Sequence, residues 1–195
     1  LPALKSDELR QLGGGAPEPD TAVALIGPGT GLGVSGLVPD GRGDWLPLQG
    51  EGGHVTLAGR TAREQQVLQH LEAQYGHASA ERALSGQGLV DIHRALQSID
   101  GTGARVRTWA AAEITHSALE DDDADCREVL DLFCAFLGTA AGNLALTLGA
   151  PFGAGVVHAQ GADESGALEE IVVTARKREE KLQDLGQSVS ALSSK

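Results

Sequence analysis

The sequence predicts an α/β fold, a mixed sheet covered by helices, and two observations carry this prediction. Near the N-terminus, the apolar runs 22–26 and 34–38 flank the stretch Gly27-Pro28-Gly29-Thr30-Gly31-Leu32-Gly33, a pattern typical of strand, tight turn and strand. Further along, apolar residues recur at helical spacing behind residues that favour helix starts. The chain of 195 residues is long enough for one such domain, or for one domain and a fragment.

Composition narrows the class of protein. The net charge of −12 argues against a nucleic-acid partner and favours a soluble protein that handles small molecules. We expect the protein to be cytoplasmic. Two cysteines, Cys126 and Cys134, are too few for a disulfide framework and lack the spacing of a metal site. No apolar run reaches the length needed to span a bilayer, so we expect no membrane span.

The first half of the chain is expected to hold strands after one short helix. Residues 1–12 have apolar residues at helical spacing behind Ser6, which predicts a helix there. The glycine- and proline-rich segment 13–20 is a loop by composition. After the glycine hairpin, residues 40–44 form the next turn, and residues 45–48 another strand.

Helices dominate the second half. Thr61 and Glu64 have the spacing of a capping box, which predicts a helix that ends at Gly76. A second helix follows 85–88, with His93 on its apolar face as a core or boundary residue. A third is expected over about 111–119, and a long fourth over about 124–148.

An acidic run, 120–125, precedes the long helix. Carboxylates are stabilised at a helix N-terminus by its dipole, so capping is the favoured interpretation, and cation binding is the alternative. Within that helix Gly138 and Gly142 would let another element approach closely.

The glycine hairpin has two interpretations. Alternating glycines around Thr30 would let backbone N–H groups approach an anion, which favours a phosphate-holding loop. A plain hairpin turn with positive-φ glycines is the alternative. A Walker A loop does not fit because no Lys follows, and a dinucleotide fingerprint fails because Leu32 and Val34 stand where its third glycine would be.

A second chemical motif follows in 49–54, Gln-Gly-Glu-Gly-Gly-His. Glu51 and His54 lie three apart between glycines, and packing does not explain them. A carboxylate accepts hydrogen bonds from vicinal hydroxyls and an imidazole can donate or accept one, so the pair suits a polyol such as a sugar. A glycine-rich turn with both side chains in solvent is the alternative.

The order of four motifs resembles one family. The glycine hairpin is followed by Gly-Glu-Gly-Gly-His at 50–54, by Gly-His-Ala-Ser-Ala-Glu-Arg-Ala-Leu-Ser-Gly-Gln-Gly-Leu at 76–89, and by Gly-Asn-Leu-Ala-Leu at 142–146. Together they resemble the bacterial ATP-dependent glucokinases of the type without a zinc motif, over about residues 1–148.

The resemblance implies an incomplete large domain of the ribonuclease-H-like (actin-like) sugar kinases, over about residues 1–150, with an irregular C-terminal tail. The family transfers the γ-phosphoryl group of ATP to the 6-hydroxyl of glucose, with Mg²⁺. By position, the second phosphate-binding loop would comprise Gly29, Thr30, Gly31 and Gly33. The glucose hydroxyls would be bound by Glu51, His54 and Glu81.

Two family motifs are absent from the sequence: the first phosphate loop, of Asp-Gly-Gly-Thr type, and the Asn-Asp pair that carries the catalytic base. Phosphoryl transfer needs a complete phosphate clamp and a group that accepts the hydroxyl proton. We therefore expect a chain that does not phosphorylate glucose by itself, or else a non-catalytic sugar-binding module. An incomplete sheet also exposes edges and apolar faces, so dimerisation or aggregation is expected.

The tail, 151–195, resembles a different family. Residues 157–160 have small residues placed as in a signal-peptidase site, and 170–175 and 188–192 resemble the TonB box and plug start of a TonB-dependent outer-membrane receptor. These features predict a chimeric chain with its join near 144–160 and a loosely ordered tail, with TonB as a partner if the tail is functional. A short β-run followed by a charged helix over 176–185 is the alternative.

Overall fold

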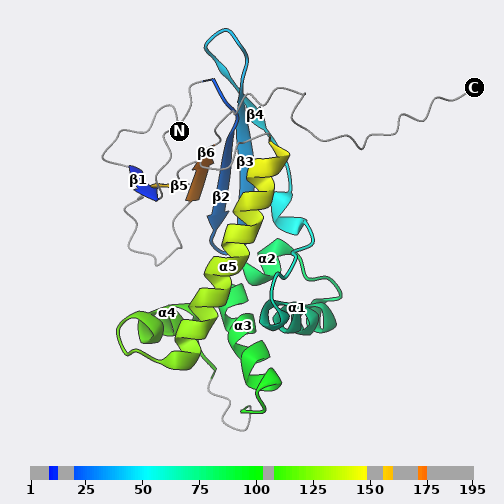
Figure 1. The fold of residues 1–195 in the computed structure, drawn as a ribbon, viewed down its shortest axis with the longest axis vertical. Coiled ribbons are helices and arrows are strands. Elements are labelled where there is room, and N and C mark those ends of the chain that lie inside the picture. Colours follow the sequence, from blue (N-terminus) through cyan, green and yellow to red (C-terminus); the bar gives the residue numbers. More distant parts are fainter. Residues whose placement is uncertain (1–8, 13–19, 103–107, 149–155, 160–170, 175–195) are drawn as a thin grey trace, which may run out of the picture.

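The structure is a computed structural model that describes residues 9–12, 20–102, 108–148, 156–159 and 171–174. The described residues form a sheet at one end of the molecule and a group of helices at the other (Figure 1). One long helix, α5, runs from the helical group along the sheet and joins the two parts. The α/β class predicted from the sequence is confirmed.

The sheet has six strands in the order β1-β5-β6-β2-β3-β4. Their bounds are β1 Leu9–Leu12, β2 Val23–Pro28, β3 Leu32–Pro39, β4 Trp45–Leu48, β5 Val156–Ala159 and β6 Ile171–Thr174. Every pairing between these strands is antiparallel, so the expected mixture with parallel strands is not seen among them. The hairpins β2–β3 and β3–β4 account for this on one side of the sheet, because a short turn can join only antiparallel neighbours.

The helix expected over 1–12 is wrong for its last four residues. Leu9–Leu12 is strand β1, and it pairs in register with β5, Leu9 opposite Ala159 and Leu12 opposite Val156. A helix of twelve residues is only marginally stable in water by itself. A backbone partner about 150 positions along the chain therefore decides the conformation here, and helical spacing does not show such a partner.

The glycine hairpin is confirmed as β2 and β3. Ile26 lies opposite Val34 and Ala24 opposite Gly36, and alternate residues of β2 are buried. Gly36 lies on the side covered by α5, where a Cβ atom would come within 3.6 Å of the Leu148 side chain. One side of the hairpin thus packs on the long helix, as alternation along a strand requires.

Four of the five described helices begin close to the predicted starts, whereas the short helix α2 was not predicted. Their bounds are α1 Ala62–Tyr75, α2 Ala80–Ala83, α3 Gly86–Ile99, α4 Ala111–Leu119 and α5 Ala124–Thr147, with a 3₁₀ turn η2 at Gly52–His54. The hydroxyl of Thr61 accepts from the Glu64 amide, and Gly76 ends α1 with φ of 77°. The Glu64 carboxylate accepts from the Arg60 amide, one residue before the position that a capping box would use.

The core lies where α1, α3, α4 and α5 meet and under the β2–β3 hairpin. Its largest fully buried side chains are Phe136, Ile26, Leu71, Leu84, Leu89, Ile92, Ile114, Val67 and Val129. Aliphatic residues therefore do most of the packing, as the scarcity of aromatic residues predicts.

The acidic run before α5 acts as a cap in the structure. Asp123 accepts from the Cys126 amide at 2.8 Å, and this hydrogen bond holds the pKa of Asp123 below its usual value. Among the described residues no group of three His, Cys, Asp or Glu side chains could hold a metal ion. The capping interpretation is confirmed.

The second half of α5 differs from expectation in two ways. A Cβ atom at Gly138 or Gly142 would meet nothing within 4 Å, so no described element approaches closely there. In addition, α5 is long and apolar enough to cross a membrane, which corrects the expectation that no such run exists. Length and composition alone are weak grounds for a span, because an apolar core helix passes the same test.

Two stretches of the tail are described, and both are strands of the sheet. β6 pairs with β2, with Ile26 opposite Ile171, and β5 pairs with β6. The short β-run expected within 170–175 is therefore present as β6, next to β2 of the same chain. The features predicted at 188–192 and 176–185 lie outside the described residues, and a TonB partner stays a prediction.

His93 of α3 is buried, as predicted. Its ring lies 5.6 Å from that of Trp109, centroid to centroid, and it is 5 % exposed. Burial lowers its pKa; Asp125 and Asp123 act in the opposite direction, and Arg94 acts in the same direction as burial. The ring is therefore held neutral in the folded chain at neutral pH.

This burial predicts a pH dependence of stability. Because the pKa of His93 is depressed on folding, the unfolded chain takes up the proton first as pH falls below about 6.5, and stability falls with it. We expect the free energy of unfolding, from urea titrations at pH 7.5 and 5.5, to fall less in His93→Leu than in the parent chain. A fall in His93→Leu as large as that in the parent chain would contradict the prediction.

Candidate functional site

The tip of the β2–β3 hairpin is closed by backbone hydrogen bonds. The Gly29 amide donates to the Gly31 carbonyl at 2.7 Å, and the Gly29 carbonyl accepts from the Gly86 amide at 2.9 Å. None of Gly29, Gly31 and Gly33 has positive φ, so the interpretation of a plain turn with positive-φ glycines does not hold. The glycines must be explained by space around the backbone.

The lack of space for a side chain explains the glycine at position 31. A Cβ atom there would lie 2.4 Å from Oε2 of Glu81, whereas at Gly29 it would meet nothing within 4 Å and at Gly33 only a carbonyl at 3.7 Å. The Leu32 amide donates to the same Glu81 oxygen at 3.2 Å. The structure thus brings Glu81, predicted to bind sugar, against the loop predicted to bind phosphate.

The motif with Glu51 and His54 folds as η2 and packs on the same hairpin. A Cβ atom at Gly53 would lie 2.4 Å from the Leu32 carbonyl oxygen, and one at Gly52 would lie 2.6 Å from a Val34 methyl carbon. These glycines therefore let η2 lie directly on β3. The Glu51 carboxylate and the His54 imidazole approach to 3.7 Å and are largely exposed, at 88 % and 61 %.

Leu32 is therefore where the predicted segments meet. Its amide is bound by Glu81, and its carbonyl lies against Gly53 of η2. Exposed carboxylate and imidazole groups on one side and a half-buried carboxylate on the other can accept hydrogen bonds from a ligand that is rich in hydroxyls.

Glu81 is carried by the short helix α2, which has supports that the sequence did not indicate. The Arg82 guanidinium lies over the Tyr75 ring at 4.1 Å, and the Tyr75 hydroxyl donates to Asp91 at 2.6 Å. Asp91 is 1 % exposed and also accepts from Gln87 and Arg94. Burial, and then the hydrogen bond to Asp91, raise the pKa of Tyr75, so the phenol remains a neutral donor.

The start of α3 also serves the hairpin. Ser85 accepts from the Gly88 amide at 3.0 Å as N-cap, and a Cβ atom at Gly88 would lie 2.3 Å from the Ala83 carbonyl oxygen. Gly88 thus lets α3 begin tightly against α2, which places the Gly86 amide on Gly29. In the sequence, the only feature that could have indicated this polar network is Asp91, an acidic residue among the apolar residues of α3.

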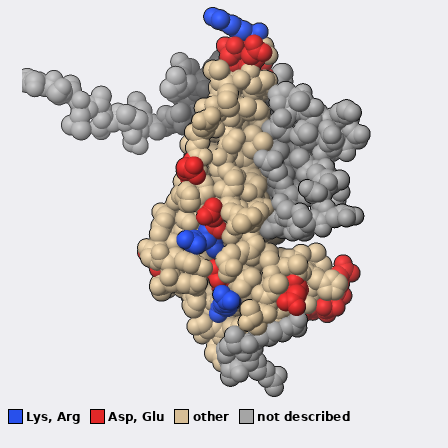
Figure 2. Space-filling view, turned by 180° about the vertical axis from the view of Figure 1, so that it is seen from behind, with Lys and Arg blue, Asp and Glu red and all other residues tan. Residues whose placement is uncertain are grey.

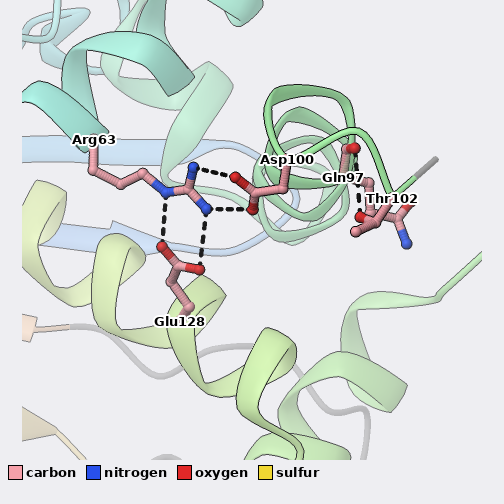
Figure 3. A network of polar contacts seen from close by, with 5 residues as sticks. All are labelled: Arg63, Gln97, Asp100, Thr102 and Glu128. Atoms are coloured by element: carbon pink, nitrogen blue, oxygen red, sulfur yellow. Dashed lines mark hydrogen bonds and ion pairs between the residues drawn. The ribbon is translucent and has the colours of Figure 1, made fainter.

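A second polar network, away from the predicted residues, clamps three helices (Figure 3). Arg63 of α1 donates to both oxygens of Asp100, at 2.7 and 2.6 Å, and to both of Glu128 on α5, at 2.8 and 3.2 Å. The guanidinium holds the pKa of Asp100 below its usual value. Such paired, charge-assisted contacts fix geometry and position the helical group.

Among the described residues, two cavities away from the predicted site can be placed. One of about 40 Å³ lies beside this clamp, lined in part by His93 and Asp125, and has room for water only. Another, of about 260 Å³ and open to solvent, lies between α1 and the segments 56–57 and 77–78, where the Thr56 hydroxyl and the His77 ring are 2.9 Å apart. Neither cavity includes a residue of the predicted site.

Charge is sparse on the face seen from behind (Figure 2). There, charged side chains gather at the end of the β3–β4 hairpin and over the helical group, and the surface between them is mostly uncharged with isolated acidic atoms. The described part of this face shows no broad basic surface.

Comparison with known proteins connects this arrangement to one family. A sequence model of the glucokinase family matches residues 1–161. The match extends beyond about residue 148, where the resemblance predicted from the sequence motifs ends. The chain is 55 % identical to the glucokinase of Chromobacterium violaceum over 150 residues, and 52 % identical to that of Aromatoleum aromaticum. These alignments cover 77 % of this chain but 42 % and 44 % of the relatives, so the chain spans less than half of their length.

Solved structures agree on the fold. A crystal structure of a glucokinase from an Antarctic psychrotroph superposes with a TM-score of 0.68 at 32 % identity, over 76 % of this chain and 45 % of the other. A Balamuthia mandrillaris glucokinase in complex with glucose gives 0.62 at 25 % identity, over 72 % and 42 %. The described part of the chain therefore has the fold of part of a glucokinase.

The packing of η2 on β3 can be tested with a matched pair of variants. In Gly53→Ala the new methyl group would meet a backbone oxygen that cannot rotate away, so we expect the free energy of unfolding to fall by about 1–3 kcal/mol. In Gly50→Ala the methyl group meets open space, and the change should stay within about 0.5 kcal/mol. Urea denaturation measures both, and equal effects would show that the close approach is not required.

Proposed function

This chain belongs to the glucokinase family, and from that premise we propose that it is a glucokinase fragment that keeps part of the sugar site and half of the nucleotide clamp. The observation that carries the proposal is the meeting of Glu81, η2 and the hairpin tip at Leu32. Three segments that are far apart in the sequence converge there, as one shared ligand site requires.

On the sugar side, Glu51, His54 and Glu81 would bind the hydroxyls of glucose. Carboxylates accept from hydroxyl donors, and the imidazole can donate or accept, so the three groups together suit adjacent hydroxyls. The Balamuthia relative, whose structure contains glucose, supports this choice of sugar. The exposure of Glu51 and His54 leaves both side chains accessible to a ligand.

On the nucleotide side, Gly29, Thr30, Gly31 and Gly33 would contact the phosphates of ATP. Backbone amides suit an anion, but the Gly29 and Leu32 amides already donate within the protein. Fewer donors then remain at the tip, so we expect weak nucleotide binding. Mg²⁺ would be held mainly by phosphate oxygens, because the described residues contain no cluster of three metal-binding side chains.

Intact glucokinases, by family resemblance, make glucose 6-phosphate from ATP and glucose in the cytoplasm. The sequence of this chain contains neither the first phosphate loop nor the Asn-Asp pair of the catalytic base. Glu51 is assigned to substrate hydroxyls and is a poor substitute for that base. We therefore propose a cytoplasmic chain that recognises glucose without phosphorylating it.

Self-association is part of the proposal. Among the residues that the structure describes, four large apolar side chains are more than half exposed: Leu46, Val55, Leu119 and Leu146. Exposed apolar groups near an open sheet edge favour contact with a second copy.

Glucose binding tests the sugar side. Calorimetry of the full chain should show heat with glucose, and Glu51→Ala should weaken the binding about tenfold, because hydrogen bonds to a charged group are lost. The exposed Glu120→Ala, in the acidic run, serves as the control and should bind glucose as the parent does. Absence of heat with glucose, both with and without ATP, would contradict the sugar-binding proposal.

A turnover assay tests whether the chain can phosphorylate glucose without the two absent motifs. A coupled assay for glucose 6-phosphate with ATP, Mg²⁺ and glucose should stay at background for the full chain, since its sequence does not contain the Asn-Asp pair that carries the catalytic base in the family. Turnover at the level of an ordinary glucokinase would show that the absent motifs are dispensable or replaced.

A further inference from the structure

The Glu81 carboxylate has a place in the hairpin as well as in the proposed sugar site. Oε2 of Glu81 accepts from the Leu32 amide at 3.2 Å and would lie 2.4 Å from a Cβ atom at Gly31. The end of the side chain thus occupies the space that the missing side chain of Gly31 leaves open. This contact joins residues 49 positions apart.

The helix that carries Glu81 is itself held by backbone contacts. The Ala80 amide donates to the Val55 carbonyl at 2.9 Å, and the Leu57 amide donates to the Ala78 carbonyl at 3.0 Å. Val55 directly follows η2, so these bonds tie α2 to the segment that carries Glu51 and His54. On its other side, the stack of Arg82 on Tyr75 anchors α2 to α1.

We propose that Glu81 is a positioning residue that latches the tip of the β2–β3 hairpin to α2 through the Leu32 amide. The Gly86–Gly29 hydrogen bond joins the same tip to α3, but both of its partners are backbone groups. The Glu81–Leu32 hydrogen bond is made by a side chain, and a ligand that binds the Glu81 carboxylate can compete with the Leu32 amide for it.

A coupling follows, and this step rests on the proposed function. A glucose hydroxyl that donates to the Glu81 carboxylate would share or replace its hydrogen bond with Leu32. Glucose would then change how firmly the hairpin tip is held, and with it the affinity of the tip for an anion. By linkage, an anion bound at the tip would change the affinity for glucose by the same factor.

Amide hydrogen exchange by NMR, on the isotope-labelled full chain, reads the latch directly. Glu81→Ala should speed exchange at the Leu32 amide about tenfold, relative to the Ile26 amide in the β2–β3 ladder. Glu81→Gln keeps an oxygen acceptor, so exchange should be slower than in Glu81→Ala. Glu51→Ala changes the other proposed sugar carboxylate and should leave Leu32 within about twofold of the parent.

A glycine pair tests the latch without touching the carboxylate. Gly31→Ala places a methyl group where Oε2 lies and displaces only the flexible end of Glu81, so it should reproduce the faster exchange at Leu32. Gly29→Ala adds the same methyl group in open space and should leave exchange at Leu32 unchanged. An unchanged Leu32 amide in both Glu81→Ala and Gly31→Ala, or equal acceleration at Ile26, would overturn the latch.

Glucose separates this inference from the proposed function. If calorimetry shows glucose binding, saturating glucose should change exchange at Leu32 by about threefold or more, and no change would overturn the coupling. If glucose does not bind, the proposed function has failed, while the latch is still decided by the exchange in Glu81→Ala and Gly31→Ala.

Discussion

The backbone of Leu32 is the point on which the rest of the site depends. Its amide is bound by Glu81, and its carbonyl leaves room only for a glycine at position 53. The Gly29 carbonyl, also in the hairpin tip, accepts a hydrogen bond from the Gly86 amide at the start of α3. The Gly53–Leu32 and Gly86–Gly29 contacts use main-chain atoms on both sides, so side-chain rotation cannot relax them, whereas the Glu81–Leu32 contact depends on the Glu81 side chain.

Glycine has two different structural roles in this chain. At Gly76 it takes a left-handed conformation and ends α1. At Gly31, Gly53 and Gly88 the backbone angles are ordinary, and what matters is the missing side chain, because another group lies within 2.4 Å of the place a Cβ atom would take. These glycines are therefore there for the close approach of neighbouring segments of the protein.

The helical group acts as a rigid support for this contact. Asp91 is buried and keeps Tyr75 in place beneath Arg82, which steadies the four-residue helix that carries Glu81. Farther away, Arg63 joins α1 to the end of α3 and to α5. A helix as short as α2 has little stability of its own, so its position is a property of these neighbours.

The sequence by itself determined the local elements and the family. The hairpin, the start of α1 at Thr61, the bounds of α4 and the Asp123 cap of α5 all follow from periodicity and capping, which act over a few residues. Only the tertiary structure decided that residues 9–12 are a strand, that Glu81 meets Leu32, and that Arg63 meets Glu128. The last two contacts join residues 49 and 65 positions apart. Local spacing carries no record of such distant partners, whereas a backbone amide or a buried carboxylate must find one when the chain folds.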